Sequence, residues 1–213
     1  LMATSSNFGN MVSMAAAALF VPFLPMLPVQ ILLNNFLYDL SEVALPLDHV
    51  DSAQLRRPKG WDLAHIRNFM LAMGSLSSLF DLLTFALLIV VLKAGEATFQ
   101  TAWFVESMAT QVLVVFVIRT RGRPWRSRPS AWLSLATLLT AGAAVLLPYT
   151  PLAAAFGFVP LPGWFLAVIA TLTAAYLVAA EITKHFFYRL TPLKRPHHRP
   201  PTMGRRRAAG ARD

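Results

Sequence analysis

Four acidic residues lie within long apolar stretches of this sequence: Asp39, Glu42, Asp81 and Glu106. An ionisable side chain inside a membrane span costs about 2.5–3.5 kcal/mol on insertion scales, so such residues are functional candidates by default. Asn35 precedes Asp39 by four residues, which places both on one helix face, and Glu42 continues that face. Carboxylate and amide oxygens are ligands for hard cations. The pattern therefore predicts a cation site within a membrane bundle.

A second polar face is predicted near residue 10. Asn7 and Asn10 are three residues apart, and Gly9 between them would allow another backbone to approach closely because it has no Cβ. Asn34 and Gln111 are interpreted instead as hydrogen-bonding partners of neighbouring helices, a role worth about 0.6 kcal/mol on average. The predicted cation-binding face therefore includes Asn7 and Asn10 but not these two amides.

Two of the four acids also have structural interpretations. Asp81 could be a hydrogen-bonding partner for the region around Ser77 and Ser78, and Glu42 could lie close enough to a helix end to reach water. These two residues are therefore auxiliary candidates, whereas Asp39 and Glu106 are the principal acids of the predicted site.

The elements that position these residues are six apolar stretches. The chain of 213 residues is 56% hydrophobic and 14% charged, whereas globular proteins carry about 25% charged residues. A membrane helix needs about 20 mostly apolar residues. The stretches of about this length are 8–27, 29–47, 69–92, 101–118, 131–147 and 163–183. We therefore predict an all-α bundle of about six transmembrane helices.

The basic residues predict the orientation of this bundle. All Lys and Arg residues except Lys93 fall in three segments, 48–67, 119–130 and 184–213. Two predicted spans separate each segment from the next, so the three share one side, which the positive-inside rule assigns to the cytoplasm. The net charge of +9 is thereby explained without nucleic acid. We expect a multi-pass protein of a bacterial inner membrane with a cytoplasmic C-terminus, surrounded by lipid.

Several kinds of chemistry are not supported by the sequence. It has no cysteine, which excludes disulfides and thiolate metal sites, and it shows no glycine-rich phosphate loop or Ser–His–Asp arrangement. Residues 1–190 are predicted to form the membrane domain and 191–213 a disordered basic tail. His197 and His198 in the tail could bind metal, but a solvated tail is the preferred interpretation. No catalytic residue is predicted.

The sequence resembles the bacterial magnesium-transporting subgroup of P-type ATPases over about residues 3–190. The runs that resemble the family's fifth to eighth membrane helices and one connecting loop are TSSNFGN (4–10), PVQ with NNFLYD (28–39), RRPKGWD (56–62), SSLFDLLTF (77–85) and WFVE (103–106), the last followed by Gln111 and Arg119-Thr120. The resemblance implies the bundle of the fifth to tenth membrane helices of such a pump.

The resemblance also implies a transport pocket for Mg²⁺, lined by Asn7, Asn10, Asn35, Asp39 and Glu106. Asn35, Asp39 and Glu106 would then be metal ligands, and Mg²⁺ would be the transported ion rather than a resident cofactor. Calcium pumps of the superfamily carry an acid where this chain has Asn10, which argues against a calcium-type site. H⁺ and Ca²⁺ remain alternatives as the transported ion.

In such pumps the energy comes from an aspartyl-phosphate formed from ATP. The family's phosphorylation motif, nucleotide and actuator domains and first four membrane helices are not found in these residues. We therefore expect a fragment that begins inside the fifth helix, is not catalytic alone, and needs the missing portion of the pump as its partner. The alternatives are a non-enzymatic membrane subunit and an inert remnant.

Overall fold

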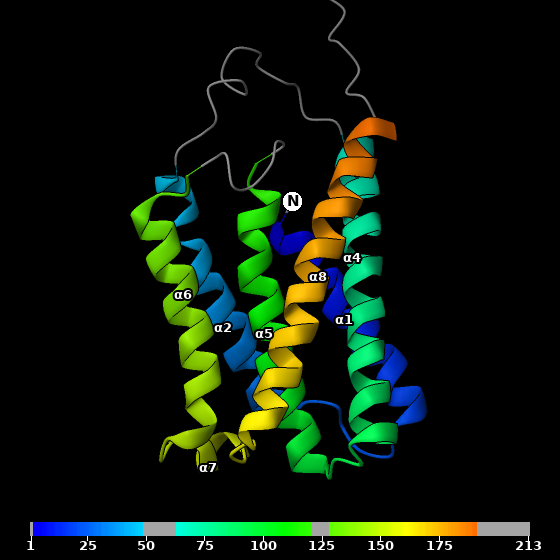
Figure 1. The fold of residues 1–213 in the computed structure, drawn as a ribbon, viewed down its shortest axis with the longest axis vertical. Coiled ribbons are helices and arrows are strands. Elements are labelled where there is room, and N and C mark those ends of the chain that lie inside the picture. Colours follow the sequence, from blue (N-terminus) through cyan, green and yellow to red (C-terminus); the bar gives the residue numbers. More distant parts are fainter. Residues whose placement is uncertain (1, 49–62, 121–127, 191–213) are drawn as a thin grey trace, which may run out of the picture.

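The computed structural model describes residues 2–48, 63–120 and 128–190, and only the backbone of residues 2–7. Within these ranges the chain is helical and contains no strand, as predicted. The long helices run alongside one another (Figure 1) and are α1 (Met2–Phe20), α2 (Pro28–Glu42), α4 (Leu63–Ala86), α5 (Glu96–Ile118), α6 (Ala131–Leu146) and α8 (Gly163–Leu190). Short turns complete the described chain: η1 (Leu45–Leu47), the π-helical η2 (Leu87–Val91), η4 (Leu147–Tyr149) and α7 (Ala153–Phe156).

Four segments are long and apolar enough to cross a membrane: Leu63–Val91, Glu96–Ile118, Ala131–Tyr149 and Gly163–Leu190. The two helices nearest the N-terminus end earlier than predicted. Helix α1 ends at Phe20, just before Pro22 and Pro25, because proline cannot continue a helix. Helix α2 has 15 residues, about 22 Å at 1.5 Å per residue. The structure therefore supports four of the six predicted spans by length and composition.

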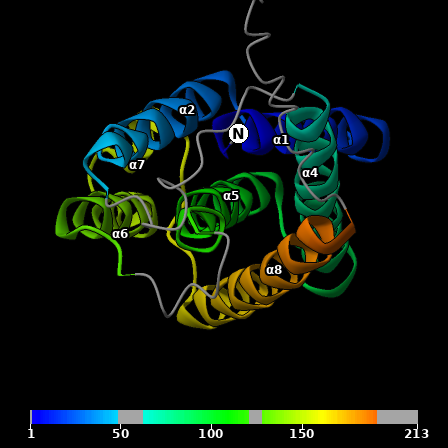
Figure 2. The ribbon, with the colours of Figure 1, turned by 90° about the horizontal axis from the view of Figure 1, so that it is seen from above.

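Helix α5 lies at the centre of the bundle. Figure 2 shows it surrounded by the other long helices, and most of its side chains are buried. Aromatic rings fix it in place: Trp103 packs edge-on against Phe85 of α4 at 4.7 Å between ring centroids, and Phe104 packs against Phe158 at 4.6 Å. Because α5 carries Glu106, this packing sets the position of that acid.

Helices α1 and α4 pack closely at Gly9, as predicted. A Cβ atom added at Gly9 would lie 3.0 Å from Ser77 Cβ and 3.2 Å from the carbonyl oxygen of Gly74, closer than normal packing allows. The Gly9 carbonyl also accepts hydrogen bonds from Ser13 Oγ at 2.9 Å and from Ser78 Oγ at 3.0 Å. The contact therefore aligns α1 with the part of α4 that carries Asp81.

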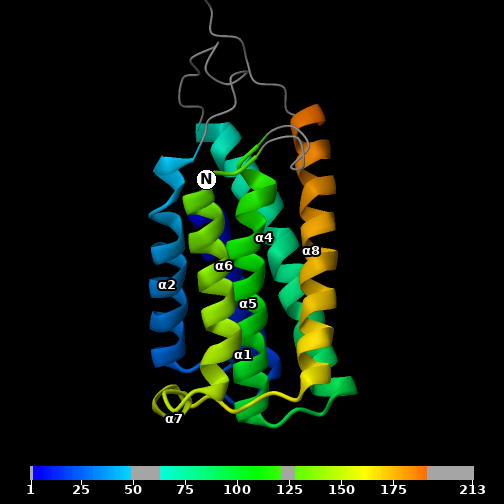
Figure 3. The ribbon, with the colours of Figure 1, turned by 60° about the vertical axis from the view of Figure 1, so that its left-hand side comes forward.

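One end of the bundle carries α7, which lies below α6 in Figures 1 and 3. Two buried glutamines hold the connections here: Gln30 Nε2 donates to the Phe156 carbonyl at 2.9 Å, and Gln100 Nε2 donates to the Leu24 carbonyl at 2.8 Å. These bonds tie the first turns of α2 and α5 to α7 and to the segment between α1 and α2.

The opposite end of the bundle carries the helix ends that adjoin the three basic segments, which agrees with their predicted common side (Figure 1). Asp48 joins three elements at this end. Its carboxylate accepts from Arg119 Nε at 2.7 Å, after α5, and from the Ser130 backbone N–H at 2.8 Å, before α6. Most of these basic segments, including His197, His198 and the tail 191–213, lies outside the described residues.

Lys184 of α8 is also near this end, but it is buried, with 1% exposure, although its sequence context groups it with the solvated basic residues. Its ammonium donates to the Val117 carbonyl at 2.8 Å and the Thr120 carbonyl at 3.2 Å, and pairs with Glu181 at 2.5 Å. The last carbonyls of a helix have no partners within it. Lys184 therefore donates hydrogen bonds to carbonyls at the end of α5, and its positive charge complements the dipole of that helix.

We predict that Lys184→Met lowers the free energy of unfolding by about 2–3 kcal/mol, because hydrogen bonds from a charged donor are lost and buried carbonyls are left unpaired. Urea or thermal unfolding in detergent measures this change. Arg189→Met is the matched control, since Arg189 is exposed in the last turn of the same helix and its replacement should change stability by less than about 0.5 kcal/mol. Equal effects of the two substitutions would contradict the prediction.

Candidate functional site

Two acids from different helices meet in the core. Asp81 of α4 is 2% exposed and Glu106 of α5 is 1% exposed, and their carboxyl groups lie within hydrogen-bonding reach of each other. Asp81 Oδ1 accepts from Trp103 Nε1 at 3.0 Å, and Asp81 Oδ2 lies 2.5 Å from Ser13 Oγ of α1. We call Asp81 and Glu106 the acid pair.

The acid pair lies at mid-depth in the bundle. Glu106 follows the first residue of α5 by ten residues, and Asp81 precedes Val91 by ten, each about 15 Å along the helix. This is half of a hydrocarbon core about 30 Å thick. Two ionised carboxylates would repel each other strongly at such a depth. At least one of the two carboxyl groups is therefore neutral unless a cation lies beside them.

The partners of Asp81 differ from those that the sequence suggested. Ser78 donates to the Gly9 carbonyl instead, whereas Asp81 contacts Ser13, Trp103 and Glu106. Since these partners come from α1 and α5, Asp81 lies where three helices meet.

A cavity of about 320 Å³ lies between α1, α2 and α5. Its lining combines three asparagine amides with large apolar side chains: Asn10, Met11, Met14, Met26, Ile31, Asn34, Asn35 and Trp103. We call it the amide cavity. Asn34 is 3% exposed, and its Oδ1 accepts no hydrogen bond within the described part of the chain. The structure therefore gives this oxygen no partner on a neighbouring helix within the described residues.

Side chains of α5 connect the amide cavity with the acid pair. Trp103 lines the cavity and donates to Asp81. Ser107, which follows Glu106, donates to Asn10 Oδ1 at 3.5 Å and accepts from Gln111 Nε2 at 2.6 Å. This bond of Gln111 is within α5, rather than to another helix as the sequence suggested. The cavity and the acid pair thus form one continuous polar region inside the bundle.

Three buried side-chain oxygens in this region accept no hydrogen bond from the residues that the structure describes: Asn34 Oδ1, Glu106 Oε2 and Gln111 Oε1. Buried polar atoms in native proteins are paired in about nine cases out of ten. Such acceptors have lone pairs of the kind that a hard cation or its bound water requires.

The other predicted site residues lie farther toward the surface. Asn35 lines the amide cavity but is exposed, and Asp39 is exposed on α2. Glu42 is half-buried and accepts a hydrogen bond from the Tyr38 hydroxyl at 2.6 Å. The side chain of Asn7 lies outside the described residues. Across the described ranges, no three His, Cys, Asp or Glu residues gather into a metal-binding group.

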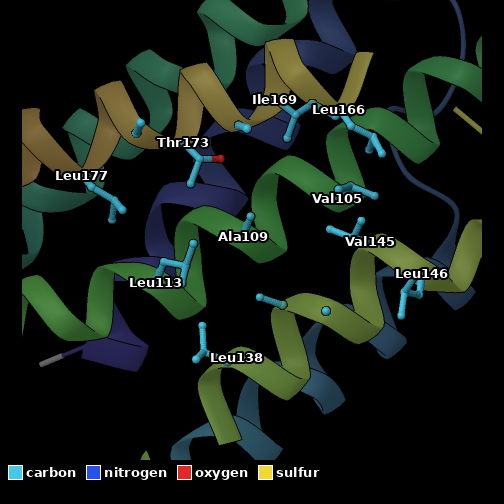
Figure 4. Close-up of a pocket in the computed structure, with 14 residues that line it drawn as sticks. Val105, Ala109, Leu113, Leu138, Val145, Leu146, Leu166, Ile169, Thr173 and Leu177 are labelled. Carbon is cyan, nitrogen blue, oxygen red and sulfur yellow. The ribbon is translucent and has the colours of Figure 1, made fainter. Parts of the chain in front are cut away.

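A larger cavity of about 680 Å³ lies between α5, α6 and α8. Figure 4 shows its apolar lining, with Leu113 from α5, Leu138 from α6 and Ile169 from α8; Thr173 is the polar side chain among its lining residues. A hard cation requires several oxygen ligands, so this cavity does not suit one. The amide cavity and the acid pair are therefore the candidate cation site.

Comparisons with known proteins agree with this chemistry. Residues 23–186 match the family model described as "Cation transporting ATPase, C-terminus". The chain is 40% identical over 193 residues to the "Magnesium-transporting ATPase, P-type 1" of Salmonella typhimurium strain LT2, and 38% identical to the protein of that name from Escherichia coli K12. Each alignment covers 88% of this chain but only 21% and 22% of the relatives. The chain therefore belongs to the cation-transporting ATPase family, and it corresponds to the C-terminal membrane region of these pumps.

Proposed function

We propose that this chain forms the ion-pathway portion of an ATP-driven Mg²⁺ transporter in a bacterial inner membrane. The observation that carries the proposal is the set of buried oxygens on α2 and α5 that accept no hydrogen bond within the described part of the chain. Leaving such an atom unpaired costs about 1–3 kcal/mol, and a bound cation with its water would remove that cost. Mg²⁺ is the preferred ion because the aligned relatives are named as magnesium-transporting ATPases.

The exposed acid on α2 supports a position inside a larger pump. Asp39 follows Pro28 by eleven residues, about 16 Å along the helix. A carboxylate at that depth would cost about 2.5–3.5 kcal/mol against lipid, so another element must cover it. In this proposal the cover is a membrane helix from the rest of the pump, and α1 and α2 are its fifth and sixth membrane helices.

The proposed ligands are those that the resemblance to the family implies. Asp39 and Glu106 supply charge, while Asn7, Asn10 and Asn35 supply amide oxygens. Mg²⁺ is bound through one or two carboxylates and usually retains several waters, so two acids and a set of amides suit it. ATP acts through catalytic domains outside these 213 residues, and the basic segments face the cytoplasm.

A chimeric pump tests the proposal. The region of the Salmonella relative that aligns with this chain is replaced by this sequence, and ATP-dependent uptake of Mg²⁺, Ca²⁺ and H⁺ is measured in membrane vesicles. We expect Mg²⁺ uptake that is saturable and requires ATP. A chimera that inserts normally but transports Ca²⁺ or H⁺ in place of Mg²⁺ would contradict the ion assignment. A chimera that inserts and transports none of the three would contradict the function itself.

A further inference from the structure

We propose that the cavity between α5, α6 and α8 holds one acyl chain of a membrane phospholipid, and that binding does not depend on the charge of the headgroup. We call this space the apolar cavity. It has a volume of about 680 Å³, and Thr173 is the polar side chain among its lining residues. The inference goes beyond the proposed function, because the lining contains none of the residues of the candidate cation site.

Small residues create the apolar cavity. Ala109 of α5, Gly142 of α6, and Ala170 and Ala174 of α8 line it, where larger side chains would close the space. A Cβ atom added at Gly142 would meet no atom from another part of the chain within 4 Å. A void lined by apolar atoms forfeits dispersion contacts, and such contacts are a main source of packing energy inside a membrane. An apolar occupant would restore them.

The apolar cavity is open toward the hydrocarbon of the bilayer. Helices α6 and α8 belong to candidate membrane spans, and only 28% of the most apolar window of each is buried, against 78% for α5. Leu138 and Leu146 of α6 line the cavity and are themselves exposed. Figure 4 shows the lining side chains of α6 and α8 on two sides of α5. Since exposed surfaces of a membrane span contact lipid chains, the occupant within reach of this cavity is an acyl chain.

One acyl chain fits the apolar cavity in length and volume. On α8 the lining runs from Leu166 to Leu177, about 16 Å at 1.5 Å per residue, and half of a hydrocarbon core is about 15 Å thick. The lining begins close to Gly163, so the cavity lies in the leaflet at the α7 end. An apolar cavity of about 150 Å³ takes up benzene. The larger volume here has room on that scale for about 25 carbon atoms, which is enough for a single long chain.

The segment next to the apolar cavity carries no charge. Residues 147–162, which join α6 to α8, contain no Asp, Glu, Lys, Arg or His and lie at the α7 end of the bundle (Figures 1 and 3). Anionic headgroups are bound by clusters of Lys and Arg. Tyr149 and Trp164 are exposed here instead, and amphipathic rings of this kind lie at the level of the headgroups. Binding should therefore depend on the acyl chain and not on the headgroup charge.

Thr173 does not require a polar ligand. Its side chain is 5% exposed, and its Oγ1 makes no hydrogen bond within the described part of the chain. A threonine hydroxyl in a helix can donate to the carbonyl four residues earlier, depending on its rotamer, as Thr171 does to the Ala167 carbonyl at 2.8 Å. The Ile169 carbonyl is the corresponding acceptor for Thr173. A chain without hydrogen-bonding groups is therefore compatible with this lining.

The test uses a phosphatidylcholine that carries a photoreactive diazirine in the middle of one acyl chain. The full 213-residue chain in detergent is mixed with an equimolar amount of this lipid and irradiated, and mass spectrometry locates the covalent adducts. We expect the adducts to concentrate on the parts of α5, α6 and α8 that line the apolar cavity. Unlabelled phosphatidylcholine and unlabelled phosphatidylglycerol with the same chains should compete equally.

Ala174→Phe and Ala175→Phe form a matched pair of variants. Ala174 lines the apolar cavity, whereas Ala175 is exposed on α8 outside the lining. We expect the first substitution to reduce the adducts in the cavity at least tenfold and the second to leave them unchanged. Gly142→Phe fills the same space from α6 and should reproduce the loss if Ala174→Phe fails to fold.

Three results would overturn the inference. Adducts spread evenly over the exposed helix faces, or equal labelling of the two phenylalanine variants on α8, would show that lipid only surrounds the bundle. Competition by phosphatidylglycerol alone would show that the headgroup charge is recognised. Loss of labelling in Thr173→Val, which removes the hydroxyl and keeps the shape, would show that the site requires a polar ligand.

Discussion

Asp39→Asn in the complete pump is expected to abolish Mg²⁺-dependent turnover of the phosphoenzyme while membrane insertion remains normal. The substitution keeps the shape of the side chain and removes one negative charge from α2. Losing a charged contact costs about 3 kcal/mol, which corresponds to an affinity for Mg²⁺ about 100-fold lower. Phosphoenzyme decay at increasing Mg²⁺ measures the effect, since a ligand role predicts loss of the Mg²⁺ response.

Glu96→Gln is the matched control for this substitution. Glu96 is exposed in the first turn of α5, at the end of the bundle that carries α7, and its removal changes the net charge by the same amount. Turnover should be normal in the control. Transport by Asp39→Asn at the wild-type rate would show that Asp39 is not a ligand.

The helical class followed from the sequence because continuous apolar stretches have one stable form in a membrane. The ends of the first two helices were less predictable. Hydrophobicity continues past Phe20, so composition alone extends the first span to residue 27, but Pro22 and Pro25 end the helix earlier. The two prolines, and not the average hydropathy, therefore determine where this helix ends.

The acids of the candidate site could be identified from the sequence more readily than their contacts. Asp81 and Glu106 were identified as acids within apolar stretches, but their contact joins helices α4 and α5 and depends on how α5 sits in the bundle. Asn34 and Lys184 were harder to interpret. The carbonyl partners of Lys184 lie 64 and 67 residues earlier in the chain, and local charge patterns carry no information about such contacts. An amide in a membrane helix likewise gives no local sign of whether it bonds a neighbour or lines a cavity.

Glu106→Gln is expected to have opposite effects on function and stability. In the empty site the acid pair places two carboxyl groups together at mid-depth, and Glu106 Oε2 has no partner within the described bundle. Glutamine removes one potential charge and adds donors that can reach Asp81. We therefore expect the free energy of unfolding to rise by about 1 kcal/mol, whereas the affinity for Mg²⁺ falls about 100-fold, corresponding to about 3 kcal/mol for a lost charged contact.

Thermal unfolding in detergent and Mg²⁺ uptake by the chimeric pump measure the two effects. Thr110→Val is the matched control on α5, because the Thr110 hydroxyl donates to the Glu106 and Ser107 carbonyls of its own helix, so the affinity for Mg²⁺ should be unchanged. A less stable Glu106→Gln variant with normal Mg²⁺ uptake would mean that the acid pair is a structural contact. A more stable variant that no longer transports would mean that the bundle tolerates two adjacent acids because the ion requires them, as expected when activity depends on a locally unfavourable site.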